Sequence, residues 1–264
     1  MVIAILGAFA IVGCQAPGTG GGGGGGNPGG GIGPAAVDLK TAGNYVIFSQ
    51  AAVTDVPTSS ITGDIGASPV TLSSITGFTV TPVLDGATGT FATAGAELVG
   101  KIYTAAMTAP TPATVLQAKL DMQAAYNDAA TRTHATGSNL NLLGGVLPAG
   151  TTLAPGLYTW GTGVHLTGDI TFSGGANDTW LMQISGTLLQ DAGFKVILTG
   201  GALAKNIVWQ VASTGVTLSG GAGSSFNGII LCLTQITTQT GATVHGRLLA
   251  QTAVTLGAST VTAP

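Results

Sequence analysis

The chain has 264 residues, of which 45% are hydrophobic but only 6% are Asp, Glu, Lys or Arg. Soluble proteins usually carry about 25% charged residues, so uncharged polar and small residues must cover this surface, which is unusual for an enzyme. With Lys+Arg 7 and Asp+Glu 10, the net charge of -3 leaves no basic stripe to neutralise phosphates, and nucleic acid is excluded as an expected partner.

The first 13 residues are almost wholly apolar and end in Ile11-Val12-Gly13-Cys14, which resembles a bacterial lipobox. This run is shorter than the roughly 20 residues that span a bilayer, and it is typical of a signal h-region although no Lys or Arg precedes it. We therefore predict that residues 1–14 are a signal segment with a lipobox-like cleavage site and that Cys14 is lipidated. A plain secretory signal is the alternative.

The location follows from this segment. A lipidated Cys14 would anchor the protein to a membrane, and Gln15 in place of Asp is typical of lipoproteins exported to the outer membrane. We expect an extracellular or cell-surface protein, as an outer-membrane lipoprotein if Cys14 is modified.

Residues 15–36 form a Gly/Pro-rich stretch that includes an unbroken glycine run from Gly20 to Gly26. Such a stretch has too few side chains to bury a core, so we predict a disordered tether. The folded body is then one domain over residues 37–264, because its self-similar β-patterned segments favour a single solenoid.

The body is expected to begin with a strand at residues 45–48 and to continue with short strands in residues 59–66 and 70–76. Thr111 and Pro112 suggest an N-cap and a first-turn proline. Leu116, Leu120 and Asn127 then recur at helical spacing, which predicts a helix over about residues 112–133. A second helix is expected over residues 94–107.

From Leu140 to the end, strand patterns return every 20 to 30 residues or so, with Gly-Gly corners such as Gly174-Gly175 and Gly200-Gly201 between them. This spacing indicates a β-solenoid, in which each coil buries its apolar face by stacking on its neighbours. A β-sandwich, the alternative, would place turns every 8 to 12 residues or so.

Five segments can be aligned on a β-branched residue at their third position, and four of them continue with Thr: Ala51-Ala52-Val53-Thr54, Ser185-Gly186-Thr187-Leu188, Thr214-Gly215-Val216-Thr217, Thr234-Gln235-Ile236-Thr237 and Thr252-Ala253-Val254-Thr255. Because strand side chains alternate between faces, Val53, Val216, Ile236 and Val254 can enter a core while the next residue faces solvent. The predicted surface residues are Thr54, Ser185, Thr214, Thr217, Thr234, Thr237, Thr252 and Thr255.

Four stretches are similar to the microbial ice-binding protein family: residues 39–45, 56–66, 125–130 and 246–256, in the family's order. The resemblance covers about residues 37–264. It implies a discontinuous right-handed parallel β-helix of triangular section with one long α-helix packed alongside. It also implies that the N-terminal coil stacks beside the C-terminal coil, with Thr54 next to Thr255, and that a monomer binds the ice crystal surface through one flat β-face.

No catalytic, metal or cofactor site is expected. The ten carboxylates are spread singly, without the paired arrangement that glycosidases need. The spacing of His134, His165 and His245 does not fit a metal site, and Cys232 lies in an apolar run. Asp64 and Asp169 each follow Thr-Gly, and we expect them to accept hydrogen bonds from backbone amides at corners.

Two other functions are compatible with these patterns. A non-ice adhesion or structural β-solenoid could use the same polar face to bind a surface polysaccharide or a neighbouring cell. A β-helical polysaccharide lyase or hydrolase is the third possibility, and the lack of clustered acids and bases argues against it.

Overall fold

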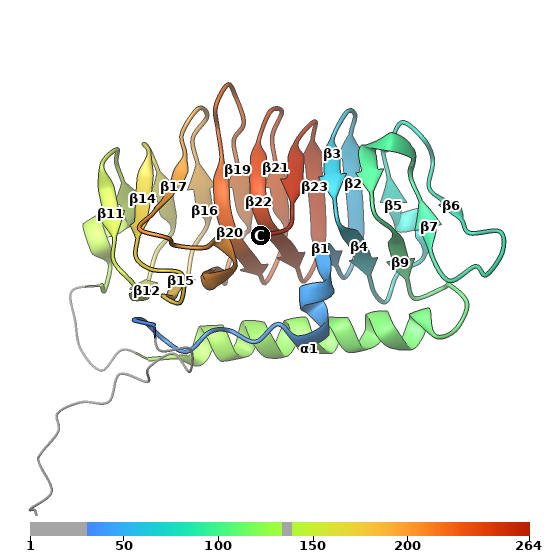
Figure 1. Cartoon of the computed structure of the whole chain (residues 1–264), viewed down its shortest axis with the longest axis horizontal. Coiled ribbons are helices and arrows are strands. Elements are labelled where there is room, and N and C mark those ends of the chain that lie inside the picture. The colour runs from blue at the N-terminus through green and yellow to red at the C-terminus, as the bar shows by residue number, and fades with distance from the viewer. Residues whose placement is uncertain (1–30, 134–138) are drawn as a thin grey trace, which may run out of the picture.

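The computed structural model describes residues 31–133 and 139–264, which form a parallel β-helix with one α-helix along its side (Figure 1). Strands of successive coils pair in parallel, except for the β6–β7 and β7–β9 pairs at one end. The described residues contain three sheets, which we call A, B and C.

Sheet A follows the order β12 (Gly156–Trp160), β15 (Trp180–Ile184), β18 (Ile207–Val211), β20 (Phe226–Cys232), β22 (Thr243–Ala250), β1 (Tyr45–Ser49), β4 (Asp64–Ala67), β9 (Ile102–Thr104), β7 (Ala92–Thr93) and β6 (Val83–Leu84). A branch adds β24 (Thr260–Thr262), β3 (Ser60–Thr62) and β8 (Leu98–Val99), starting from the first half of β22. Sheet B follows the order β10 (Val146–Leu147), β13 (Val164–Leu166), β16 (Leu188–Gln190), β19 (Val216–Leu218), β21 (Ile236–Thr238), β23 (Ala253–Gly257), β2 (Ala52–Val56) and β5 (Ile75–Thr76). Sheet C contains β11 (Thr151–Leu153), β14 (Ile170–Ser173) and β17 (Val196–Thr199).

The first and the last coil in chain order stack on each other in the middle of the β-helix. Strand β22 pairs with β1, β23 with β2, and β24 with β3, so the last coil lies directly beside the first one (Figure 1). The register aligns Ile47 with Leu248 and Thr54 with Thr255. The expected discontinuous β-helix is therefore confirmed, including the contact between its N-terminal and C-terminal coils.

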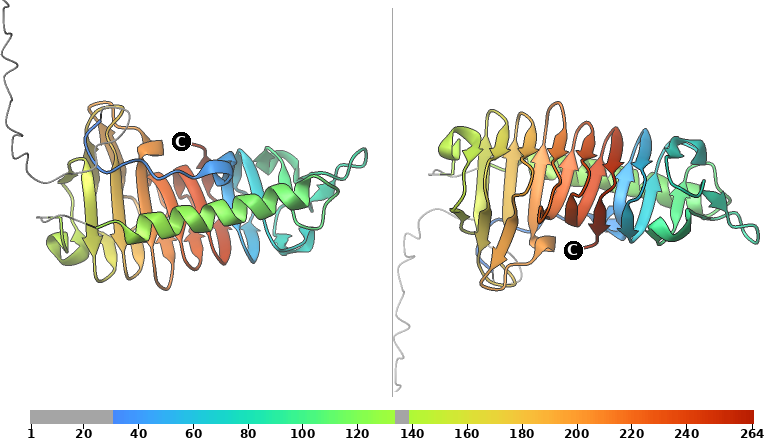
Figure 2. Two further views of the ribbon diagram at one scale, coloured as in Figure 1. Left: turned by 90° about the horizontal axis from the view of Figure 1, so that it is seen from below. Right: turned by 90° about the horizontal axis from the view of Figure 1, so that it is seen from above.

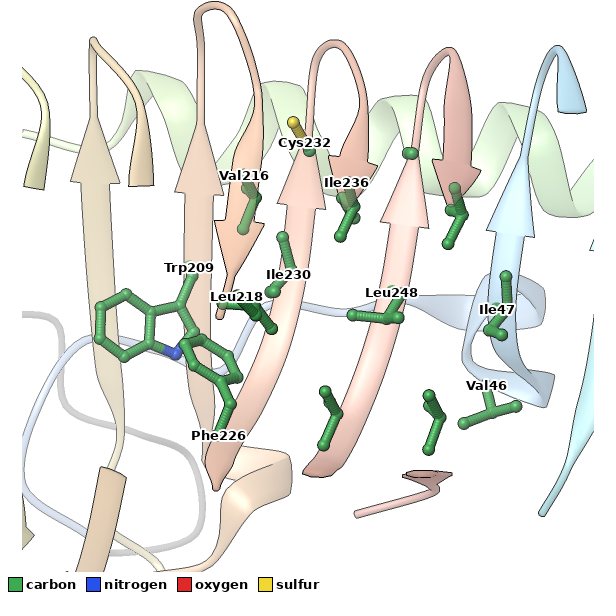
Figure 3. Close-up of a cluster of buried hydrophobic side chains, with 14 of the residues drawn as sticks. Val46, Ile47, Trp209, Val216, Leu218, Phe226, Ile230, Cys232, Ile236 and Leu248 are labelled. Atoms are coloured by element: carbon green, nitrogen blue, oxygen red, sulfur yellow. The ribbon is translucent and has the colours of Figure 1, made fainter. Parts of the chain in front are cut away.

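Alternation of apolar and polar residues explains why these segments form strands. Seven strands of sheet B each place an apolar side chain at the same inward position, and each of these side chains is at most 2% exposed: Val164, Leu188, Val216, Ile236, Val254, Val53 and Ile75. These side chains meet Ile230, Leu248 and other residues of sheet A in one continuous core (Figure 3). An inward side chain of one coil is shielded from water only when the neighbouring coils stack on it.

Aromatic side chains fill the wider part of this core. The Phe172 ring lies edge-on to Trp180 and Trp209, with ring centroids 5.7 and 5.6 Å apart, and Trp209 is 5.2 Å from Phe226. Each indole N–H of Trp160, Trp180 and Trp209 donates to a backbone carbonyl oxygen. The rings are thus buried without an unpaired donor.

The helix α1 (Thr111–Thr131) runs along sheet A and covers its outer surface (Figure 2). Its buried side chains include Val115, Ala118, Met122, Ala125 and Ala129, which pack on outward residues of sheet A such as Leu181 and Leu249. The helix was correctly predicted, and Leu116 and Leu120, which repeat at helical spacing, lie on its outer side, where each is 48% exposed. Small alanine side chains face the sheet since they let the helix backbone approach it closely.

The C-terminal end of α1 is attached to sheet A by Gln183. The buried Gln183 amide donates to the carbonyl oxygens of Ala129 and Arg132, at 2.7 and 2.6 Å, and its own oxygen accepts from the Thr159 hydroxyl. These bonds satisfy carbonyl groups that a helix end leaves unpaired. No helix in the described part of the chain is both long and apolar enough to cross a membrane.

Two predictions about the helical region were wrong. Residues 94–107 contain one short 3-10 helix (Gly95–Glu97) followed by β8 and β9 instead of an α-helix, because these short strands pair with β3 and β4 and extend the stack. Thr111 lies inside α1 and does not cap it, since its hydroxyl donates to the Thr90 carbonyl oxygen at 2.6 Å. Pro112 does occupy the first turn of the helix.

The folded unit begins earlier than residue 37. The backbone of Ile32 donates to Asp178 and accepts from the Thr179 N–H, while the Thr179 hydroxyl donates to Pro34. Arg132 donates to the carbonyl oxygens of Ala35 and Ala36. The expected tether boundary at residue 36 therefore falls within a segment that is bonded to the body, and the rest of the expected tether and the signal segment, with Cys14, lie outside the described residues.

Candidate functional site

A single file of threonines runs across sheet B. The register pairs Thr217 with Thr237, Thr237 with Thr255, and Thr255 with Thr54, so four consecutive coils each present one threonine at the same position. The preceding residues Val216, Ile236, Val254 and Val53 are buried, which turns the threonines outward. We call this set the threonine file, and it confirms the predicted alignment of these four segments.

The file continues by one coil beyond the predicted residues. Strand β5 pairs with β2 and aligns Thr76 with Thr54, and their hydroxyl oxygens are 3.5 Å apart. The alternation Ser74-Ile75-Thr76 was visible in the sequence, but nothing there indicated that this segment follows residue 54 in the stack. Thr76 is exposed, and we add it to the threonine file.

Ser185 and Leu188 are out of register with this file. The structure aligns Leu188 with Val216 and Leu189 with Thr217, so the segment is shifted by one residue from the predicted alignment. Leu188 is buried and Leu189 occupies the outward position. The prediction for Ser185 was therefore wrong in position, because Leu188, and not Thr187, supplies the inward side chain of this coil.

Three other predicted residues lie in the corners that lead into the strands. Thr214 precedes β19, Thr234 precedes β21, and Thr252 comes directly before β23. Thr214 and Thr252 are exposed, whereas the Thr234 hydroxyl donates to the Ser213 carbonyl oxygen at 2.5 Å. These residues lie at the margin of the surface, and the Thr234 hydroxyl donates its hydrogen bond to a group within the protein.

The surface around the file is uncharged. Two positions before each file threonine, the chain has Gly215, Gln235, Ala253, Ala52 or Ser74, all uncharged. Charge begins one coil beyond Thr217, where Asp191 directly follows β16 and has a carboxylate oxygen 2.8 Å from the Nε2 atom of His165 on the next coil. Asp191 and Leu189 mark one end of the uncharged surface.

A hollow flanks the file next to Thr237 and Thr255. It has a volume of about 650 Å³, and its lining includes Gln239, Gly220 and Gly257. Water next to the hydroxyls of Thr237 and Thr255 therefore has room on one side of the file.

The ionisable groups near this surface are structural. Burial raises the pKa of Asp55, which is 2% exposed beneath the file, while its hydrogen bond from the Ser59 hydroxyl at 2.5 Å opposes that shift. Burial also raises the pKa of the Cys232 thiol, in line with a small apolar core residue. Neither group is presented to solvent as a nucleophile or a base.

The remaining candidates for chemistry do not form a centre. Asp64 accepts from the Lys101 N–H and Asp169 from the Lys195 N–H, each at 2.8 Å, so both carboxylates bind backbone amides of the next coil as predicted. Within residues 31–133 and 139–264, no group of three or more His, Cys, Asp or Glu could hold a metal ion. His134 lies outside the described residues.

Comparisons with known proteins give one consistent result. A family model described as Ice-binding-like matches residues 47–262. An ice-binding protein of Flammulina populicola is 44% identical over 235 residues, which is 88% of this chain and 90% of that protein. One from Colwellia sp is 44% identical over 240 residues, 88% of this chain and 85% of that protein.

Solved structures agree with these sequence matches. The structure of an ice-binding protein from Arctic yeast superposes with a TM-score of 0.79 at 38% identity, covering 87% of this chain and 94% of that one. An ice-binding protein domain of Shewanella frigidimarina gives a TM-score of 0.75 at 27% identity, covering 87% and 98%. The chain belongs to the ice-binding-like protein family.

Proposed function

We propose that this protein adsorbs to ice through the threonine file and the uncharged surface around it. The observation that carries the proposal is the register that places Thr217, Thr237, Thr255 and Thr54 at one position of four adjacent strands. Neighbouring strands repeat about every 4.8 Å. The file is thus a regular row of hydroxyl and methyl groups that a repeating water lattice can meet.

Rigidity and lack of charge both favour this function. Threonine is stiff at χ1 and loses little conformational entropy when its surroundings become ordered. An ionised side chain would hold its own hydration shell against the ordered water of ice, and the coils that carry the file present none there. The hollow beside Thr237 and Thr255 can retain water that continues the lattice onto the protein.

The chain should inhibit ice recrystallisation and produce thermal hysteresis with shaped crystals. Both effects follow from irreversible coverage of a growing ice plane. The first is measured as the ice grain size in a recrystallisation assay with micromolar protein. An adhesion module that binds a surface polysaccharide would instead bind glycans and leave ice grain size unchanged. Release of reducing sugars from a glycan panel would indicate an enzyme, which we do not propose.

We infer that the protein acts as a monomer outside the cell and that Cys14 anchors it to a membrane. Ile11-Val12-Gly13-Cys14 and the glycine-rich stretch after it support this inference. A glycine-rich chain of n residues spans about 5 to 6 Å × √n, so about sixteen residues between Cys14 and the bonded segment would hold the body roughly 20 to 24 Å from the bilayer.

Cys14→Ser should move the protein from the membrane fraction to the soluble fraction, because the lipid acceptor is lost. Fractionation of cells that express each form, with a lipid-incorporation assay on the wild type, measures this. Cys232→Ser is the matched control and should leave the distribution unchanged. An unmodified Cys14 in wild-type protein that is already free in the medium would refute the anchor and leave ice adsorption unaffected.

A further inference from the structure

A second set of outward hydroxyl groups lies on another side of the β-helix. Strands β22, β24 and β3 pair in the register Thr243–Thr260–Ser60 and, two residues later, His245–Thr262–Thr62. The residues between the two rows are Val244, Val261 and Ile61, and each is 0% exposed. The rows therefore point outward as two parallel files that are three coils long, and we call them the hydroxyl array.

The hydroxyl array is separate from the side that α1 covers. The first half of β22 pairs with β24, whereas its second half pairs with β1 under the helix. Thr243, His245, Ser60 and Thr62 are exposed, and Thr260 and Thr262 are half-buried. The outer strands of the array are thus open to solvent, and its middle strand is partly exposed.

The same three coils carry the hydroxyl array and the middle of the threonine file. Strand β21 with Thr237 leads into β22, β23 with Thr255 leads into β24, and β2 with Thr54 leads into β3. Each coil consequently presents threonine on sheet B and hydroxyl groups again after the next corner. The two surfaces form one continuous uncharged region that bends around this edge of the β-helix.

Buried hydrogen bonds fix the corner between the two surfaces. The Thr238 and Ser259 hydroxyl oxygens are 2.7 Å apart, the Ser259 N–H donates to the Ser59 hydroxyl at 3.0 Å, and Ser59 donates to Asp55. Thr238, Ser259, Ser59 and Asp55 are each at most 4% exposed. Because these bonds connect three successive coils, the array is held rigidly in relation to the threonine file.

We propose that the hydroxyl array is a second ice-adsorbing surface, a proposal that rests on the proposed function of the threonine file. Its six side chains include no carboxylate or ammonium group, and its only titratable member, His245, has its Nδ1 atom 3.2 Å from the Thr262 hydroxyl. Within each row the side chains repeat at the spacing between neighbouring strands. The two rows are separated by two residues along each strand. That two-dimensional order suits a lattice of water, and a surface on a different side of the β-helix meets a different ice plane.

The test is the pattern of planes that the fluorescently labelled chain marks on a single-crystal ice hemisphere. Wild-type protein should mark two families of planes. Thr262→Tyr should remove one family and Thr237→Tyr the other, because a bulky ring lifts each surface off its lattice. Leu116→Tyr is the control, since Leu116 is exposed on the outer side of α1, away from both surfaces, and the added ring should leave both families marked.

Melting curves accompany each variant, and Thr62→Tyr repeats the experiment at an exposed position if Thr262→Tyr does not fold. One family of planes in the wild type, lost with Thr237→Tyr and kept with both array variants, would overturn the second surface and leave the proposed function intact. A folded wild-type chain that marks no plane would overturn both. Two families that both survive the array variants would also overturn the proposal for this surface.

Discussion

Thr237→Tyr should abolish most of the thermal hysteresis, because Thr237 lies in the middle of the surface that is proposed to adsorb to ice. Thr237 lies between Thr217 and Thr255 in the threonine file, so a tyrosine ring there would stand above its neighbours and separate them from a flat lattice. Ice then grows through the plane that this surface no longer protects, even if another plane stays covered. Thermal hysteresis, measured at equal protein concentrations, checks the loss.

The matched control for Thr237→Tyr is Thr152→Tyr, which adds the same ring to an outward threonine of sheet C. Both changes are at the surface, where substitutions usually alter the free energy of unfolding by only about 0.5 kcal/mol. Both variants should therefore melt close to the wild type. Wild-type hysteresis in a folded Thr237→Tyr protein would disprove the assignment of this surface.

Trp209→Ala should lower the free energy of unfolding by about 3 to 5 kcal/mol, the usual cost of removing a large buried aromatic side chain. Trp209 is 0% exposed and packs between Phe172 and Phe226, and its loss leaves a cavity that the two sheets cannot close. The Asn227 carbonyl oxygen would also lose the indole donor 3.2 Å away. Denaturant-induced unfolding, followed by circular dichroism, measures the change.

Leu116→Ala on the outer side of α1 is the comparison for Trp209→Ala. Leu116 is 48% exposed, so its truncation should alter the free energy of unfolding by about 0.5 kcal/mol or less. Equal denaturation midpoints for the two variants would contradict the core described here. The same comparison tests which side of the helix faces sheet A.

Period-2 alternation in the sequence was sufficient to predict which residues of the threonine segments enter the core. Val53, Val216, Ile236 and Val254 are buried and the threonines after them face outward, because a strand can place successive side chains only on opposite faces. The corner carboxylates Asp64 and Asp169 were also predictable, since glycine before an aspartate permits a tight corner and the short side chain can then accept from nearby backbone amides. These are local properties.

Register and stacking order depend on contacts between residues that are far apart in the chain. The one-residue shift that excludes Ser185 depends on which of Thr187 and Leu188 the neighbouring coil buries, and both fit a strand. Thr76 joins the file only because β5 pairs with β2. Helical spacing alone does not show which face of α1 packs on the sheet, because the exposed Leu116 and Leu120 repeat as regularly as the alanines that do pack on it.

The sequence by itself therefore determined the strand pattern, the helix and the uncharged threonine-rich composition of this protein, because each depends on residues within a few positions of one another. The tertiary structure decided which hydroxyl groups share a surface. Resemblance to relatives suggested that the last coil meets the first. The aligned rows on sheet B and on β22, β24 and β3 form only when strands that are some 200 residues apart in the chain pair with each other. Closing a chain over that distance is stabilised by the burial of the shared core, which no local pattern encodes.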